Sequence, residues 1–285
     1  MAERPRLVGL AYRAMGSRLD AEDVVQEAWL RAQRVDWSTI DRPEAWFTTV
    51  VSRLALDSLR LARRSRETYV GPWLPEPVRT SSGDDPADAV ELAESLTLGF
   101  LRLLESLDPV ERVVFLLADV FDTPYDDIAA VVDRTPEACR QLASRARRRV
   151  HAGQVRHDLP EDATQVVAAL LAAVSVGDVD QVVSLLADDV VVVSDGGAAT
   201  RAARRPVRGR ERAARFMINI NRKFLWGMEV EPMTINDEPG LLVRRRNGQP
   251  FLALAVQVID GRARAIHVAR NPDKLAALDL TTPLL

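Results

Sequence analysis

The sequence is poor in the residues that cross-link chains and build most zinc sites. Its 285 residues include one cysteine, Cys139, and three histidines. A disulfide within the chain is therefore impossible, and a zinc site made of cysteine and histidine is not expected, because such sites use four ligands. We expect no metal and no cofactor.

Long apolar runs are also missing. No segment reaches the roughly 18 consecutive apolar residues that a membrane-spanning helix needs, and the basic N-terminus lacks the apolar core of a signal peptide. The hydrophobic fraction of 47% and the charged fraction of 28% are typical of globular proteins. We therefore expect a cytoplasmic protein that does not contact membranes, and the length favours two or more domains.

Charge is unevenly distributed although the net charge is only −3. Residues 53–66 contain five arginines and one acid, residues 68–96 contain six acids and one base, and residues 134–149 contain six arginines and one acid. The rest, from residue 158 on, is balanced. Two basic blocks separated by an acidic one predict two nucleic-acid-facing units on an acidic tether.

The first 67 residues have helical periodicity. One helix is expected to begin with Asp20 as its N-cap, and its outward face is acidic and amide-rich, which would repel phosphate and favours a protein partner. A second helix is expected from Pro43. It turns Trp46, Phe47 and Leu61 inward and ends in arginines. Trp46 and Phe47 could also stack on unpaired bases, although core packing is the commoner role for at least one of them.

Residues 68–90 read as an acidic, proline-rich linker. Its sequence Trp73-Leu74-Pro75-Glu76-Pro77 stands out, because a solvated linker gains nothing from exposing Trp73 and Leu74. We expect this segment to dock on another part of the molecule. The alternative is a local turn with an incidental tryptophan.

Residues 91–152 predict a helical domain with a helix-turn-helix. Asp108 and Thr135 are expected N-caps, each followed by proline at the first helical position. The helix after Thr135 is basic and suits the major groove. A solvated corner of two helices is the alternative.

From about residue 160 the pattern changes to α+β. Two helices (164–175 and 180–187) precede a strand at Val190, a turn at Asp195, a basic loop and a helix near 210–222. Apolar runs separated by Asn247-Gly248 and Asp260-Gly261 then predict antiparallel hairpins.

Three motifs in order give the first 150 residues a family resemblance. The segment from Asp20 to Arg31, the segment from Arg42 to Arg60 and the segment from Leu107 to Arg147 resemble an extracytoplasmic-function sigma factor of the sigma-70 class. The resemblance implies core RNA polymerase and promoter DNA as partners. It assigns polymerase binding to Asp23, Gln26, Glu27, Leu30 and Arg31. It assigns the −10 element to Trp46, Arg53, Arg60, Arg63, Arg64 and Arg66. It assigns the −35 element to Arg140, Gln141, Ser144, Arg145, Arg147 and Arg148.

The last part resembles the cone-shaped, SnoaL-like α+β fold that one sigma-factor subgroup carries. The expected domains are 1–67, 91–152 and 160–278, that is, two all-α helical domains followed by an α+β domain, with linker 68–90. The resemblance implies that the fused domain modulates sigma activity, so that no separate anti-sigma factor is required. The implied regulatory residues are Trp73, Leu74, Pro75, Glu76, Pro77, Asp195, Gly196, Gly197, Asn271, Pro272, Asp273, Lys274 and Leu275.

These observations predict that the Trp73–Pro77 segment packs on the C-terminal domain beside Asp195 and Asn271. Removing residues 271–275 is then expected to change transcription without harming the fold. Two other functions stay open, a small-molecule-responsive helix-turn-helix repressor and an enzyme fused to a DNA-binding module. The first would bind duplex DNA without polymerase. The second needs paired acid–base groups, which the sequence does not point to. A ligand-sensing pocket in the C-terminal domain is a further option, and the sequence names no ligand.

Overall fold

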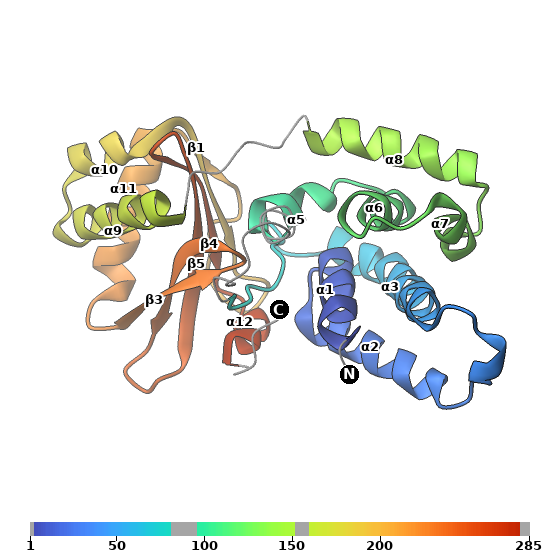
Figure 1. The fold of residues 1–285 in the computed structure, drawn as a ribbon. Coiled ribbons are helices and arrows are strands. Elements are labelled where there is room, and N and C mark those ends of the chain that lie inside the picture. The colour runs from blue at the N-terminus through green and yellow to red at the C-terminus, as the bar shows by residue number, and fades with distance from the viewer. Residues whose placement is uncertain (1–2, 81–95, 152–159, 280–285) are drawn as a thin grey trace.

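The computed structural model describes residues 3–80, 96–151 and 160–279. Two helical heads lie on one side of the molecule and a sheet-containing domain lies on the other (Figure 1). The linker segment 68–80 and helix α5 (Leu98–Leu104) lie between them.

The N-terminal head contains α1 (Glu3–Met15), α2 (Arg18–Ala32), a short 3-10 helix (Trp37–Thr39) and α3 (Pro43–Glu67). The predicted start of α3 at Pro43 is confirmed. The predicted N-cap Asp20 is wrong, because Ser17 caps α2 and its hydroxyl accepts from the Asp20 backbone N–H at 3.2 Å. Leu61, also expected inside, is 72% exposed, and Leu59 is the last buried residue among the described side chains of α3.

The second head contains α5, α6 (Pro109–Phe115) with a π-helical turn (Leu116–Val120), α7 (Tyr125–Val132) and α8 (Pro136–His151). Both predicted caps are present. Asp108 and Glu111 form a capping box, and the Thr135 hydroxyl accepts from the Ala138 N–H at 3.2 Å. Asp133 ends α7 in the left-handed conformation, which turns the chain into α8 as the helix-turn-helix prediction requires.

The C-terminal domain is α+β. Its elements in chain order are α9 (Pro160–Val176), α10 (Val179–Leu185), β1 (Leu186–Asp195), β2 (Val207–Arg208), α11 (Arg210–Ile220) with a π-helical turn (Asn221–Leu225), β3 (Glu229–Ile235), β4 (Glu238–Arg244), β5 (Pro250–Ile259), β6 (Arg262–Ala269), α12 (Pro272–Leu275) and a 3-10 turn (Ala276–Asp279). The strand order is β2-β1-β6-β5-β4-β3, antiparallel except for the β1–β6 pair. The second helix was predicted to run to residue 187, but β1 already begins at Leu186.

Two of the buried apolar clusters contain residues from more than one of the expected domains. The two heads, expected as separate domains, share one buried cluster that runs from Leu7 in α1 to Val150 in α8. Leu98, at the start of α5, belongs instead to a cluster with β4, β5 and α12. The heads are therefore packed together, and α5 joins them to the C-terminal domain.

Candidate functional site

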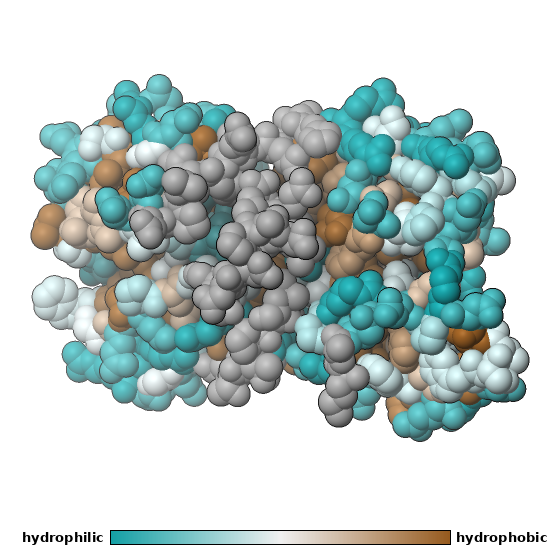
Figure 2. Space-filling model, in the orientation of Figure 1, coloured by the Kyte–Doolittle hydropathy of each residue, from teal (hydrophilic) through white to brown (hydrophobic). Residues whose placement is uncertain are grey.

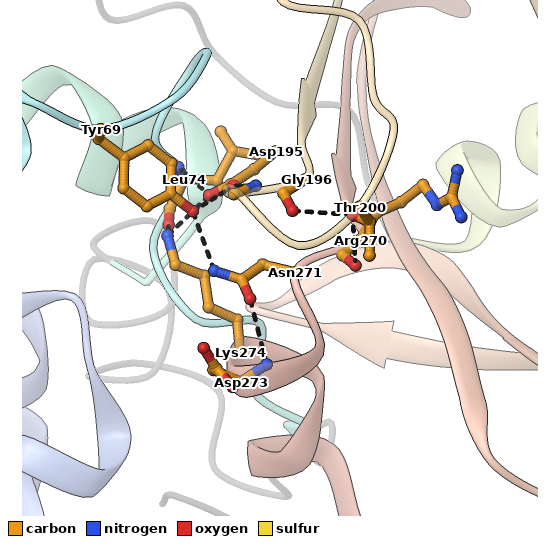
Figure 3. Close-up of polar contacts among 10 residues, drawn as sticks. Tyr69, Leu74, Asp195, Gly196, Thr200, Arg270, Asn271, Asp273 and Lys274 are labelled. Atoms are coloured by element: carbon orange, nitrogen blue, oxygen red, sulfur yellow. Dashed lines mark hydrogen bonds and ion pairs between the residues drawn. The ribbon is translucent and has the colours of Figure 1, made fainter.

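The carboxylate of Asp195, at the end of β1, is the centre of a buried contact between the linker and the C-terminal domain (Figure 3). It accepts from the Tyr69 hydroxyl at 2.6 Å, the Leu74 N–H at 2.8 Å and the Lys274 ammonium at 2.7 Å. Lys274 also donates to the Leu74 carbonyl, and Asn271 donates to the Tyr69 oxygen at 3.0 Å. We call these five residues the Asp195 latch.

The latch holds a tryptophan between two domains. The Lys274 nitrogen lies 4.1 Å from the centroid of the Trp73 ring, a distance typical of a cation–π contact. A Cβ at Gly16 would lie 2.7 Å from the same ring, so glycine is required there for Trp73 to approach the N-terminal head. Gly16 has a φ of +70°, which glycine adopts without strain.

A glycine shapes the other side of the latch. The Gly197 N–H donates to the Asp195 carboxylate at 3.1 Å. A Cβ at Gly197 would lie 2.9 Å from the Asn271 side-chain nitrogen and 3.2 Å from the Tyr69 hydroxyl, and its φ is +58°. The Asp195-Gly196-Gly197 turn therefore needs glycine for both space and backbone conformation.

The remaining predicted regulatory residues divide into buried and exposed ones. Leu74, Pro75, Pro77, Gly196 and Leu275 are buried, whereas Pro272 and Asp273 are exposed. Leu275 packs in the core of the C-terminal domain. The predicted removal of residues 271–275 without harm to the fold is therefore a poor test, because it would open that core.

A second contact is centred on Asn236, which the sequence analysis missed. Its side chain donates to the Tyr12 hydroxyl at 2.7 Å and to the Leu96 carbonyl at 2.9 Å, and it accepts from the Val78 N–H at 3.0 Å. It thus binds the N-terminal head, the linker and the start of the second head at once. Tyr12 and Asn236 are fully buried, and burial raises the pKa of the Tyr12 hydroxyl.

Linker residue Glu76 also binds the N-terminal head. Its carboxylate accepts from the Arg18 N–H at 2.7 Å, its N–H donates to the Gly16 carbonyl at 2.8 Å, and its carbonyl accepts from the Tyr12 hydroxyl at 2.7 Å. Desolvation raises the pKa of the Glu76 carboxyl, while hydrogen bonds from Ser17 and Arg18 oppose that effect. The linker is therefore fixed on both of its sides.

Two ionisable groups are buried where α5 meets the sheet. The Glu238 carboxylate accepts from the Leu98 N–H at 3.2 Å, and burial raises the pKa of this carboxyl to about 8. His267 lies close to Gly99, and burial, together with the charge of Arg102, lowers the pKa of the imidazole to about 3. Both side chains are thus uncharged at neutral pH while α5 stays docked.

The two heads contact one another through arginines at the rim of their shared core. Arg53 of α3 donates to the Ala130 carbonyl of α7 at 2.6 Å, and Arg42 pairs with Asp127 at 2.6 Å. The buried Arg112 of α6 donates to the Ala14 carbonyl of α1 at 2.6 Å. Arg53, predicted to contact the −10 element, therefore has a protein partner in this conformation.

Most of the predicted −35 residues form one exposed face of α8. Arg140, Gln141, Ser144, Arg145 and Arg148 are exposed, while Cys139, Ala143 and Ala146 pack inward. Arg147 differs, because it bonds Asp119 at 2.6 Å and the Tyr125 hydroxyl at 3.0 Å within its own head. It lies on the same helix but is held by its own domain.

The predicted −10 residues lie along α3. Trp46 is half-buried, with Phe47 beneath it and Trp37 against it at ring-centroid distances of 5.1 and 5.3 Å. Trp37, which the sequence analysis did not single out, is the exposed member of this aromatic cluster. Arg60 is exposed and pairs with Asp57. The side chains of Arg63, Arg64 and Arg66 lie outside the described residues, although their backbone is helical.

The predicted polymerase face of α2 is open to solvent. Asp23, Gln26 and Arg31 are exposed, and Glu27 pairs with Arg31 at 2.8 Å. Leu30 is 49% exposed among these polar groups. A single exposed leucine is common on protein surfaces, so the polymerase-binding role of this face stays a prediction.

In the described parts of the chain, no helix is long and apolar enough to cross a membrane, and no three His, Cys, Asp or Glu side chains gather as metal ligands would. Figure 2 shows apolar residues on the surface only in small areas between hydrophilic ones on the face in view.

Comparisons with known proteins agree with the two helical heads. The family model for sigma-70 region 2 matches residues 1–65, and the model for sigma-70 region 4 matches residues 98–150. The ECF RNA polymerase sigma factor SigJ of Mycobacterium tuberculosis is 40% identical, covering 98% of this chain and 93% of SigJ. The probable ECF sigma factor SigI of that species is 39% identical over 65% of this chain and 64% of its own length.

The solved structures extend the likeness to the whole fold. The crystal structure of Mycobacterium tuberculosis SigJ matches with a TM-score of 0.79 and 39% identity, over 98% of both chains. The match includes the C-terminal α+β domain, which the sequence predicted as SnoaL-like, and it does not favour the repressor alternative. The chain belongs to the extracytoplasmic-function sigma factors of the sigma-70 class, with an α+β domain fused behind its two sigma regions.

Proposed function

We propose that this chain directs promoter-specific initiation by binding core RNA polymerase and promoter DNA, and that its C-terminal domain holds it in a closed, inactive conformation. The exposed face of α2 would bind polymerase, α8 would read the −35 element, and α3 would bind the −10 element. The protein would act by binding alone, without covalent chemistry or a cofactor.

The contact between the two heads is the observation that carries this proposal. Elements named for positions 35 and 10 lie about 25 base pairs apart, which is about 85 Å of B-DNA at 3.4 Å per base pair. Two heads that share one apolar core cannot reach both elements of a straight duplex together. The heads must therefore separate before the promoter is read.

The C-terminal domain opposes that separation through the linker. Trp73, Leu74 and Glu76 are bound to the N-terminal head and to the Asp195 latch at the same time. Asn236 binds the linker and both heads. A domain bonded to three parts of the closed form stabilises it, so a separate anti-sigma factor would not be required.

Run-off transcription with purified core polymerase tests the proposal in the full chain. Trp73→Ala removes the ring held between Gly16 and Lys274 and should raise transcript yield. Arg264→Met is the control, because it breaks an ion pair with Asp189 (2.7 Å) on the surface of the same C-terminal domain. Equal yields from the Trp73 variant and the unaltered chain would contradict the closed-state proposal.

Substitutions on α8 test the DNA-binding part separately. Arg145→Ala should lower transcription from all dependent promoters, while Gln141→Ala should change the preference at individual −35 positions. Arg264→Met is again the control, because it removes an arginine that pairs with Asp189 on the surface of the C-terminal domain, away from α8. If the two test variants behave like the control, α8 does not read the promoter.

A further inference from the structure

The C-terminal domain contains a cavity of about 850 Å³ that none of the contacts described above uses. It lies between the sheet and the helices α9 and α11. Leu170, Met217, Leu254 and Ile266 are among its mainly apolar lining, and Phe224 and Val230 are lining residues that are also exposed to solvent. Its volume falls within the usual range for small-molecule sites.

The charged residues among the described lining of this apolar space are two arginines, Arg201 and Arg270. Arg270, directly after β6, lines the cavity together with Ser194 and Arg201. Among the lining residues that the structure describes, none is acidic. Arg270 donates to the Arg201 carbonyl at 2.8 Å and stacks on Phe251 at 4.3 Å, but its Nε is buried without a hydrogen-bond partner.

The charge of Arg270 is poorly compensated. Burial lowers the pKa of its guanidinium, and Arg245, which stacks on the same Phe251 ring, lowers it further. A partly buried cation without a counter-ion is costly, and a carboxylate is the group that a guanidinium binds through two parallel hydrogen bonds. The free Nε is one of the two donors that such a pair uses.

We propose that the cavity binds a small molecule with an apolar body and one carboxylate, whose carboxylate pairs with Arg270. The apolar lining would bury the body, and the absence of acidic residues among the described lining residues favours an anion over a cation or a neutral polar molecule. Fatty acids and polycyclic carboxylic acids share this chemistry, and the two probes used below distinguish a flexible from a rigid body.

The cavity and the Asp195 latch lie on opposite faces of the same two strand ends. Ser194 faces the cavity while Asp195 faces the linker, as neighbouring strand residues do. The Arg270 and Asn271 N–H groups both donate to the Asp195 carbonyl, at 2.7 and 3.1 Å. The Thr200 hydroxyl bonds the Gly196 and Arg270 carbonyls, and the Arg270 side chain extends away from the Asp195 carboxylate (Figure 3).

Binding at Arg270 therefore acts on the latch through one shared strand end. A carboxylate on Nε and Nη2 of Arg270 would shift the guanidinium whose Nη1 donates to the Arg201 carbonyl, and that bond helps to hold the loop that contains Gly196 and Gly197. That loop supplies one of the donors to Asp195. This second step rests on the proposed function, and it makes the ligand a releasing signal for the closed form.

Calorimetric titration of the full chain tests the site without any transcription. The probes are sodium dodecanoate and sodium deoxycholate, each below its micelle-forming concentration, and dodecan-1-ol serves as the probe without a charge. Dodecanoate or deoxycholate should bind at least about tenfold more tightly than dodecan-1-ol. Absence of binding by both carboxylates, or equal affinity for the alcohol, overturns the proposal.

Substitutions of Arg270 test whether this residue binds the carboxylate of the ligand. Arg270→Met should weaken carboxylate binding about tenfold or more and leave dodecan-1-ol binding unchanged, while Arg264→Met should change neither. Arg270→Lys keeps the charge but loses the two-point geometry, so its carboxylate affinity should lie between those of the unaltered chain and of Arg270→Met. It replaces Arg270→Met as the test if that variant proves unstable in thermal unfolding. Unaltered carboxylate binding by both Arg270 variants overturns the assignment.

A transcription assay then separates the two steps. The carboxylate that binds should raise transcript yield of the full chain and leave the yield of the Arg270→Met variant unchanged. Binding without a change in yield refutes the coupling but leaves the site. If Trp73→Ala also leaves the yield unchanged, the closed-state proposal itself has failed.

Discussion

The molecule has two internal contact regions, here called seams, and they differ in the kinds of residue that form them. The seam between the two heads is mainly apolar, with arginines bonded to carbonyls at its rim. The seam between the heads and the C-terminal domain is buried and includes polar contacts of Asp195, Lys274, Asn236 and Glu238 beside the apolar contact of Leu98. Apolar contact is non-directional and tolerates small shifts, whereas buried polar groups are costly as soon as one partner leaves.

This difference indicates a division of labour. The apolar seam holds the heads together as long as no binding partner competes for them. The polar seam fixes one arrangement of the linker, the heads and the sheet. It should be lost cooperatively, because its hydrogen-bonded groups depend on one another. Substitutions at the polar contacts should therefore have larger effects than substitutions of the exposed arginines at the rim of the apolar seam.

The largest effect is expected from Lys274→Met. It leaves the buried Asp195 carboxylate without its cation, which typically costs about 3–5 kcal/mol when one partner of a buried pair is removed. Thermal and denaturant unfolding of the C-terminal domain should show this loss. Adding Asp195→Asn to Lys274→Met should restore part of it, and a double variant no more stable than Lys274→Met would argue against a paired latch.

The next largest effect is expected from Asn236→Gly. Asn236 has a φ of +53°, which glycine adopts freely, so the variant removes three hydrogen bonds without straining the backbone. Leaving buried partners unsatisfied should cost about 2–3 kcal/mol of unfolding free energy. Asp260→Gly, at an exposed turn of the same domain and with a φ of +52°, is the matched control. Equal effects of the two would contradict the role of the Asn236 side chain.

A moderate, pH-dependent effect is expected at Glu238. Its pKa is raised to about 8 when α5 is docked, against an ordinary value of 4.5, so docking takes up a proton between these values. The stabilisation is complete below pH 4.5 and is lost as the pH rises through 8, by at most about 1.4 kcal/mol per pH unit.

His267 opposes that trend at lower pH. Its pKa is lowered to about 3 from 6.5, so its stabilising effect is complete above pH 6.5 and is lost as the pH falls. The window from pH 6.5 to 8 therefore separates the effect of Glu238 from that of His267. Over this window Glu238→Gln should abolish the fall in unfolding free energy. A slope that survives in this variant would assign the effect to another group.

The smallest effect is expected at the rim of the apolar seam. Arg53→Met removes an exposed hydrogen bond to the Ala130 carbonyl and should change the unfolding free energy by less than about 0.5 kcal/mol. It should lower transcription nonetheless if Arg53 contacts DNA in the open form. A loss of stability as large as that of Asn236→Gly would show that the two seams do not differ as described.

Local signals allowed much of the fold to be predicted. Thr135-Pro136 and Asp108-Pro109 predicted helix starts, because caps depend on neighbouring residues. Asp20 failed as a cap since Ser17, three residues earlier, offered an equally good oxygen. The shared core of the heads could not be predicted, because an apolar face has the same periodicity whether it packs within its own domain or against another.

The interdomain site was predicted only in part, because local signals reveal a docking segment but not the distant residues that it contacts. An apolar island in a polar linker indicated docking at Trp73 and Leu74, but their partners Lys274 and Asp195 lie more than 100 residues away. The sequence does not point to Asn236, because Asn-Gly and Asp-Gly are the usual hairpin signals. The turn between β3 and β4 is instead Asn236-Asp237, with both residues at positive φ. The three partners of Asn236 come from three segments of the chain, which no local pattern connects.

The linker also lies against the outermost strand of the sheet. Arg79 forms a β-bridge with Ile235 of β3, and its guanidinium pairs with Glu231. Among the residues that the structure describes, β3 is the last strand of the sheet on this side, so departure of the linker would uncover backbone groups that attract other chains. Pro232 and the acidic side chains of β3 limit that hazard without removing it. The opened factor would thus be prone to self-association, and prompt capture by polymerase would protect its solubility as well as its activity.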